Sequence, residues 1–223
     1  MSTLPSHLSQ LAASIPPSPS DELLRAWGHD LAAEYLQVVT EAGITPGSRV
    51  LELATGTGRM TAVLTRLGYS VLGGDSTDEK TDQVWNRVQP EYARLVKLTL
   101  LDMRELPFKP GSVPAITCMN TLHELQSPHE CLQEMLRVHD HTGVFILGDF
   151  NETGFDTMQR LHQHIYQDNH PCGRMNVLDA EPILKRHFKE VRTIHTPLNI
   201  TFIASGKSEA AANPDSLSLQ PLV

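Results

Sequence analysis

Apolar residues recur in short runs that alternate with stretches of helical spacing over residues 45–205. Short apolar runs bounded by turn residues predict buried strands, whereas apolar residues three and four positions apart predict amphipathic helices. The predicted strands are residues 49–54, 70–75, a segment within 93–102, 113–120 and 143–150. The predicted helices are residues 59–67, about 78–89, 127–139, about 155–167 and about 179–187. This alternation predicts a parallel sheet with helices on both faces.

Two further strands are predicted at residues 190–197 and 199–206. They are separated by too few residues for a parallel crossover, which needs a dozen or more, so they should form an antiparallel hairpin. Few doubly wound sheets carry such a hairpin. The predicted fold class is therefore α/β, a mostly parallel sheet that ends in antiparallel strands.

The ends of the chain differ in composition from its middle. Residues 1–17 are expected to be a flexible N-terminus. The segment "SPSD" predicts a helix start, with Ser18 as N-cap, and Gly43 ends the helical pattern that follows. The polar tail at residues 206–223 is expected to be disordered. These boundaries predict one domain over residues 18–205, with residues 18–43 as a helical segment before the first strand.

Composition limits the function classes. The 223 residues carry 18 Lys and Arg against 26 Asp and Glu, a formal net charge of -8, which argues against nucleic-acid binding. No apolar run reaches the roughly 20 residues of a membrane helix, and the first residues show no signal-peptide pattern. Three cysteines without a C-x-x-C pair are typical of a reduced, cytoplasmic setting.

The stretch "VLELATGTGRMT" at residues 50–61 places a Gly-containing turn between the first strand and a helix. Gly56 and Gly58 allow close approach of a ligand, and the helix N-terminus favours negative charge there. A Walker loop is excluded because no Lys follows. A dinucleotide loop needs a third glycine where Thr61 stands, and Glu52 would repel a pyrophosphate. A ligand without phosphates, such as an amino-acid-bearing nucleoside, fits better.

Carboxylates are expected in a row at this edge of the sheet. Asp75 ends the second strand 19 residues after Gly56, the spacing at which an acid typically accepts from ribose hydroxyls. Asp102 ends the third strand and can accept from an adenine amine, while Met103 offers apolar contact to the ring. Such a row suits a ribose, an adenine amine and an ammonium, and it suits a polyphosphate poorly.

These residues resemble the class I S-adenosylmethionine-dependent methyltransferases, especially the small-molecule branch. The resemblance covers about residues 45–205, with motifs "VLELATGTGRMT", "GGD", "LDMRELPFKPGSVPAITCMNTLHEL" and "RVHDHTGVFILGDF". It implies a Rossmann-like three-layer sandwich of seven strands, a helical N-terminal lid over residues 18–43, and S-adenosylmethionine as cofactor, with S-adenosylhomocysteine as product. The residues it places around the cofactor are Glu52, Ala54, Thr55, Gly56, Gly58, Asp75, Ser76, Asp102, Met103 and Asn120. Ala54 departs from the family, which has its first motif glycine there.

The acceptor side is less sharply defined. His123 and His170 are candidate catalytic proton acceptors, because a general base is needed where the acceptor must lose a proton. The resemblance also suggests that the N-terminal helix and the insertion after the fifth strand close over the acceptor. The resulting substrate-pocket candidates are Trp27, Tyr35, His162 and Tyr166, and core packing is the alternative role for Trp27 and Tyr35. No metal is expected, because the His-rich segment 162–172 matches no zinc spacing.

The sequence therefore predicts methyl transfer from S-adenosylmethionine to a small molecule, without nucleic-acid or membrane partners and with a homodimer left open. Two alternatives stay open. One is a nicotinamide-dependent oxidoreductase, and the other is a non-catalytic protein that binds S-adenosylmethionine as the partner of another enzyme.

Overall fold

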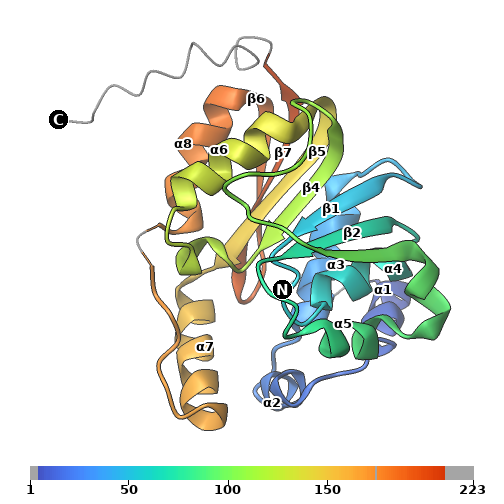
Figure 1. The fold of residues 1–223 in the computed structure, drawn as a ribbon. Helices are drawn as coiled ribbons and strands as arrows, with labels where there is room; N and C mark the ends of the chain where they lie inside the picture. The colour runs from blue at the N-terminus through green and yellow to red at the C-terminus, as the bar shows by residue number, and fades with distance from the viewer. Residues whose placement is uncertain (1–4, 174, 209–223) are drawn as a thin grey trace.

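The computed structural model describes residues 5–173 and 175–208, which form a seven-stranded sheet with helices on both faces (Figure 1). The strands are β1 Arg49–Leu53, β2 Ser70–Asp75, β3 Val96–Leu100, β4 Val113–Met119, β5 His139–Phe150, β6 Phe188–His195 and β7 Asn199–Lys207. The α-helices are α1 Ser6–Ala13, α2 Pro19–Ala26, α3 Leu31–Ala42, α4 Arg59–Arg66, α5 Thr81–Val88, α6 Pro128–Val138, α7 Glu152–Ile165 and α8 Val177–His187. Short 3-10 turns are η1 Pro90–Leu95 and η2 Leu122–Glu124.

The strand order is β3-β2-β1-β4-β5-β7-β6, and this confirms the predicted fold class. Strands β1 to β5 are parallel, and β7 lies antiparallel between β5 and β6. The chain order of the strands reverses where β1 pairs with both β2 and β4. In an open parallel sheet, this switch point opens a crevice beyond the carboxyl ends of the strands, where ligands bind.

Two buried apolar clusters fill the space between the sheet and its helices. One packs α6 and α8 against one face through Leu132, Leu184 and Phe145. The other packs α3 and α4 against the opposite face and includes Val39 and Val63. Figure 1 shows these pairs of helices on opposite sides of the sheet, which gives the three layers. A smaller cluster joins α2 to α7.

The N-terminal region differs from the sequence expectation. Residues 6–13, which were expected to be flexible, form α1, and this helix buries Leu8 and Ala12 while Ile15 follows it into the core. The expected lid over residues 18–43 is two helices, because the chain turns at Gly28, where φ is +88°, before α3 starts. Ser18 is the N-cap of α2 as predicted, and it forms a capping box with Asp21.

Other boundaries move by a few residues. Strand β5 begins at His139, directly after α6, rather than at Gly143, so the "HDHTG" segment is part of the strand. Helix α7 begins at Glu152 because the side chain of Asn151 caps it by accepting from the backbone N–H of Gly154. Within the described residues no helix combines the length and the apolar character needed to cross a membrane. Most of the tail expected to be disordered, residues 209–223, lies outside the described part of the chain.

Candidate functional site

A cavity of about 820 Å³ opens at the carboxyl ends of β1, β2, β3 and β4. Small-molecule sites in proteins are typically about 300–1,000 Å³ in volume. The cavity lies at the switch point of the sheet, where the strand order predicts it. It is lined by all the residues that the sequence placed around a cofactor except Gly58: Glu52, Ala54, Thr55, Gly56, Asp75, Ser76, Asp102, Met103 and Asn120.

The loop after β1 has left-handed backbone at three positions. Ala54 has φ +56°, Gly56 has φ +53° and Gly58 has φ +78°. Gly58 is the N-cap of α4, and a Cβ there would lie 2.8 Å from the Cα of Val84. Gly58 therefore permits close packing of the loop on α5. The sequence placed Gly58 around the cofactor, but it is not among the residues that line the cavity. Backbone strain of the kind that Ala54 carries is concentrated at functional sites.

Glu52 is almost fully buried at 2 % exposure and lies at the base of the cavity. Its carboxyl group accepts a hydrogen bond from the Thr61 hydroxyl of α4, so it braces the helix that follows the loop. Burial raises the pKa of Glu52 to about 8, although the hydrogen bond from Thr61 acts in the opposite direction. The raised pKa favours the protonated form of Glu52 at neutral pH.

Asp75 is fixed at the end of β2 by two backbone donors. It accepts from the N–H of Gly56 at 2.8 Å and from the N–H of Ser76 at 2.7 Å. One carboxylate thus joins the loop after β1 to the loop after β2. Since a carboxylate offers about four acceptor positions, Asp75 can still accept from a ligand hydroxyl.

Asp102 has a competing partner that the sequence analysis did not foresee. It is half exposed and pairs with Arg104 at 2.7 Å. The hydrogen bonds from Arg104 lower the pKa of Asp102 to about 2. A ligand amine at Asp102 would share this carboxylate with the guanidinium of Arg104, which also lines the cavity.

The opposite side of the loop carries positive charge. Arg59, the first residue of α4, lines the cavity and pairs with Asp21 of α2 at 2.6 Å. Asp21 also pairs with Arg87 of α5 at 2.6 Å, and all three side chains are largely buried. Burial alone would raise the pKa of Asp21, but the two guanidinium groups hold it well below its usual range. Two cations share one buried anion, so this network keeps a net positive charge beside the cavity.

Tyr35 and Asn120 contact each other and line the same cavity as Arg59. The Asn120 side-chain amide donates to the Tyr35 hydroxyl at 2.9 Å, and both residues line the cavity. Burial raises the pKa of Tyr35 to about 12, so its hydroxyl stays neutral. Asn120 has φ +53°, a further left-handed residue at the site. Helix α3 therefore contributes the Tyr35 side chain to the cavity, and its role in a substrate pocket stays a prediction.

His123 lies beside the cavity but does not line it, whereas the next residue, Glu124, does. The Nδ1 atom of His123 lies 2.6 Å from a carboxylate oxygen of Asp149, and its Nε2 lies 3.6 Å from Glu124. Burial alone would lower the pKa of His123, but the hydrogen bond to Asp149 and the nearby Glu124 carboxylate raise it to about 9. Asp149 was missed by the sequence analysis, although an acid at the carboxyl end of the fifth strand was a usable signal.

His170 packs against His123, with 5.0 Å between the ring centroids. Burial and the neighbouring His123 lower the pKa of His170 to about 4. Like His123, His170 does not line this cavity. The two histidines predicted to be catalytic are thus brought together, at the side of the cavity rather than inside it.

The other three pocket candidates lie away from this cavity. Trp27 stacks under the Arg160 guanidinium at 3.9 Å, where α2 and α7 pack on each other. His162 pairs with Asp168 at 2.9 Å, and Tyr166 is 56 % exposed. Contacts between α2 and α7 occupy Trp27, so core packing, the alternative considered for it, describes its position.

The cavity carries charges of both signs, and its lining includes Lys80 and Arg104. Asp75 and Asp102 lie at the ends of β2 and β3, whereas the Arg59 guanidinium and the N-terminus of α4 lie beyond β1. This arrangement matches a ligand with hydroxyl and amine donors at one end and a carboxylate at the other.

Residues 51–147 match the protein family described as "Methyltransferase domain". Among curated proteins, the chain is similar to the demethylmenaquinone methyltransferase of Renibacterium salmoninarum, with 29 % identity over 125 residues, 56 % of this chain and 51 % of that protein. It is also similar to the protein of the same name from Beutenbergia cavernae, with 33 % identity over 122 residues, 54 % of this chain and 48 % of that protein. The chain thus spans about half the length of these relatives.

Among solved structures, an S-adenosylmethionine-dependent methyltransferase from Aquifex aeolicus has a TM-score of 0.57 and 19 % sequence identity. The match covers 91 % of this chain and 98 % of that chain, and it shows that the fold is shared. Together with the family match, it confirms the resemblance to class I methyltransferases that the sequence motifs predicted.

Proposed function

We propose that this chain, whose residues 51–147 match the methyltransferase domain family, transfers a methyl group from S-adenosylmethionine to a small molecule. The observation that carries the proposal is the single cavity that gathers the loop after β1 with Glu52, Asp75 and Asp102. These residues come from three neighbouring strands, and their chemistry complements a ribose, an adenine amine and an amino-acid group.

In this proposal the cofactor lies along the carboxyl edge of the sheet. Asp75 accepts from the ribose hydroxyls, and Asp102 and Met103 contact the adenine. The methionine carboxylate points to the Arg59 guanidinium and the N-terminus of α4, because these positive groups lie next to the loop after β1, whereas Arg104 is paired with Asp102. Glu52 lies near the methionine ammonium, which would favour ionisation of its carboxyl group. S-Adenosylhomocysteine would leave as product.

We propose that positioning supplies most of the catalysis, since the sulfonium methyl is already activated and effective molarity can lower the barrier by about 7–11 kcal/mol. Asn120 and Tyr35 lie where they could orient an acceptor, and both line the cavity. The catalytic role predicted for His123 and His170 stays a prediction, and their location beside the cavity does not favour it. Demethylmenaquinone is the first acceptor to assay, because two relatives carry that substrate in their names.

We also propose a cytoplasmic setting without nucleic-acid or membrane partners. Support comes from the thiols of Cys118, Cys131 and Cys172, which are free, and from the net charge of -8. Association into a homodimer stays a prediction that sedimentation velocity would decide.

The test is the affinity for S-adenosylhomocysteine of the Asp75→Ala variant. Loss of a charge-assisted hydrogen bond should weaken binding by about 1–3 kcal/mol. Asp82→Ala, an exposed acid in the first turn of α5, is the matched control and should bind like the wild type. Equal affinities of all three proteins would contradict the ribose position. Binding of NAD in place of the adenosyl ligand would favour the oxidoreductase alternative, and cofactor binding without turnover would favour the non-catalytic partner.

A further inference from the structure

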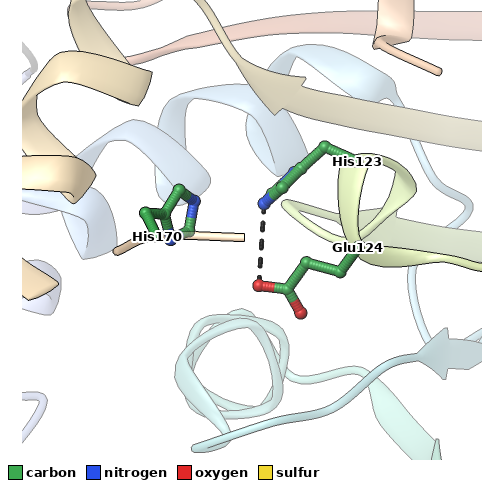
Figure 2. A group of neighbouring side chains, drawn as sticks. All are labelled: His123, Glu124 and His170. Atoms are coloured by element: carbon green, nitrogen blue, oxygen red, sulfur yellow. Dashed lines mark ion pairs between the residues drawn. The ribbon is translucent and has the colours of Figure 1, made fainter. Parts of the chain in front are cut away.

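Three side chains with metal-binding chemistry meet beside the cavity (Figure 2). His123 and Glu124 belong to η2 after β4, and His170 comes from the segment between α7 and α8. One ligand atom of each residue lies within 4.8 Å of the others, and Nε2 of His123 is 3.6 Å from Glu124. Figure 2 shows the His123 ring and the Glu124 carboxylate directed at one another, with the His170 ring alongside.

His123 is oriented as metal-binding histidines usually are. Asp149 accepts from its backbone N–H at 3.0 Å and contacts its Nδ1 at 2.6 Å, and the same carboxylate accepts from the N–H of Phe150. A carboxylate on Nδ1 holds the ring so that Nε2 faces Glu124, and a metal ion would take the place of the proton on Nε2. The contact between Asp149 and Nδ1 therefore adds an orienting group to the three candidate ligands.

The Nε2 atom of His123 is buried, and its contact with Glu124 at 3.6 Å is too long for a hydrogen bond. The side chain is 2 % exposed, and within residues 5–173 and 175–208 this nitrogen has no hydrogen-bond partner. An unsatisfied buried polar atom costs about 1–3 kcal/mol and is rare in native structures. A bound cation would satisfy this atom.

His170 offers a second unpaired ring. Neither of its ring nitrogens has a hydrogen-bond partner in the part of the chain that the structure describes. Its segment is held against η2 by backbone packing, since a Cβ at Gly173 would lie 2.0 Å from the carbonyl oxygen of His123. The backbone N–H of His170 donates to the side chain of Gln159 at 3.0 Å. Close backbone contact and this hydrogen bond keep the His170 ring near the other two ligands.

We propose that His123, Glu124 and His170 bind one divalent transition-metal ion, with Zn²⁺ as the best fit to the donor set. Two imidazoles and one carboxylate with an open fourth position form a common three-residue zinc site. Zinc bonds of about 2.0–2.2 Å at tetrahedral angles separate ligand atoms by about 3.4 Å. The 3.6 Å between His123 and Glu124 is already close to that spacing, and no ligand atom of the three lies more than 4.8 Å from another.

This inference goes beyond the proposed methyl transfer, because the ion would bind without cofactor. It replaces the expectation that no metal binds, which rested on the spacing of residues 162–172 alone. His170 lies 46 positions after Glu124 along the chain, so local spacing does not reveal the group. Because Glu124 also lines the cavity, the ion would lie at the cavity's edge.

The experiment uses the full chain without a polyhistidine tag, stripped with EDTA and titrated with Zn²⁺ by calorimetry. Co²⁺ substitution followed by visible absorption reports the coordination geometry. We expect one ion per chain and a tetrahedral Co²⁺ spectrum. Glu124→Gln and His170→Ala should each weaken binding at least about tenfold, and Asp149→Asn should weaken it by about 10- to 100-fold through loss of the ring's orientation.

His129→Ala and Glu130→Gln are matched controls, because both residues are exposed on α6. They should bind the metal like the wild type. No saturable binding up to about 100 µM, or equal binding by Glu124→Gln and His170→Ala, would overturn the proposal. Calorimetry with S-adenosylhomocysteine on the same stripped protein tests the proposed function separately, so failure of one is distinguishable from failure of the other.

Discussion

Replacement of Glu52 by Gln isolates one buried ionisable group. The side chain is 2 % exposed and accepts a hydrogen bond from Thr61. Burial raises the pKa of Glu52 from 4.5 to about 8 in the folded chain. The Glu52→Gln variant would keep the size of the side chain and an oxygen that accepts from Thr61, but its amide cannot ionise. The two proteins should therefore differ in how their stability depends on pH.

The sign and size of this dependence follow from proton linkage. Between pH 4.5 and about 8 the folded chain holds a proton on Glu52 that the unfolded chain has released. The free energy of unfolding of the wild type should therefore fall as pH rises, by up to about 1.36 kcal/mol per pH unit from this group. Over the difference of about 3.5 pH units the loss reaches about 5 kcal/mol. Above pH 8 both states are ionised and the contribution stays constant.

The assay is urea unfolding of the cofactor-free proteins at several values between pH 4.5 and 9. The free energy of unfolding of Glu52→Gln minus that of the wild type cancels the other titrating groups. This difference should grow by several kcal/mol up to pH 8 and then level off. Glu105→Gln, an exposed acid after β3, is the control and should follow the wild type. A difference that does not change with pH would refute the account of Glu52.

Two further substitutions test the packing around the cavity. Gly58→Ala should lower the free energy of unfolding by about 2–4 kcal/mol, because position 58 has a left-handed φ and the added Cβ would clash with the backbone of Val84. Gly68→Ala is the control: its φ is +84°, but the added Cβ would lie in open space, so the loss should be only about 1–2 kcal/mol. Equal losses in urea unfolding would exclude the clash. Asp21→Asn leaves two buried guanidinium groups without a counter-charge and should cost about 3–5 kcal/mol in the same assay. A loss below about 1 kcal/mol there would mean that water, not Asp21, balances the two charges.

The edge of the sheet at which the cavity opens could be predicted from the sequence because strand ends determine it. Asp75 and Asp102 close apolar runs, and parallel strands bring their carboxyl ends to one edge of the sheet. The glycine pattern likewise located the loop, and all but one of the predicted cofactor residues line the cavity. Gly58 was assigned to the cavity because a sequence motif does not separate a glycine that faces a ligand from one that faces a neighbouring helix.

Two polar networks beside the cavity could not be predicted because their contacts join distant segments. Asp21 and Arg59 are 38 positions apart, and His123 and Asp149 are 26 apart. Such pairs depend on how helices and loops pack on the sheet, which no local period encodes. Helix α1 was missed for a related reason: it buries only Leu8 and Ala12, so its sequence shows little apolar periodicity.

The most direct test of the central claim is isothermal titration calorimetry of the wild-type chain with S-adenosylmethionine, S-adenosylhomocysteine and NAD in parallel. We predict saturable binding of both adenosyl ligands, one per chain, and no heat with NAD. Binding of NAD alone would contradict the roles given to Glu52, Asp75 and Asp102. Binding of none of the three would contradict the cofactor site as a whole, and Ala54, which stands where the family's motif has its first glycine, would be the first residue to change.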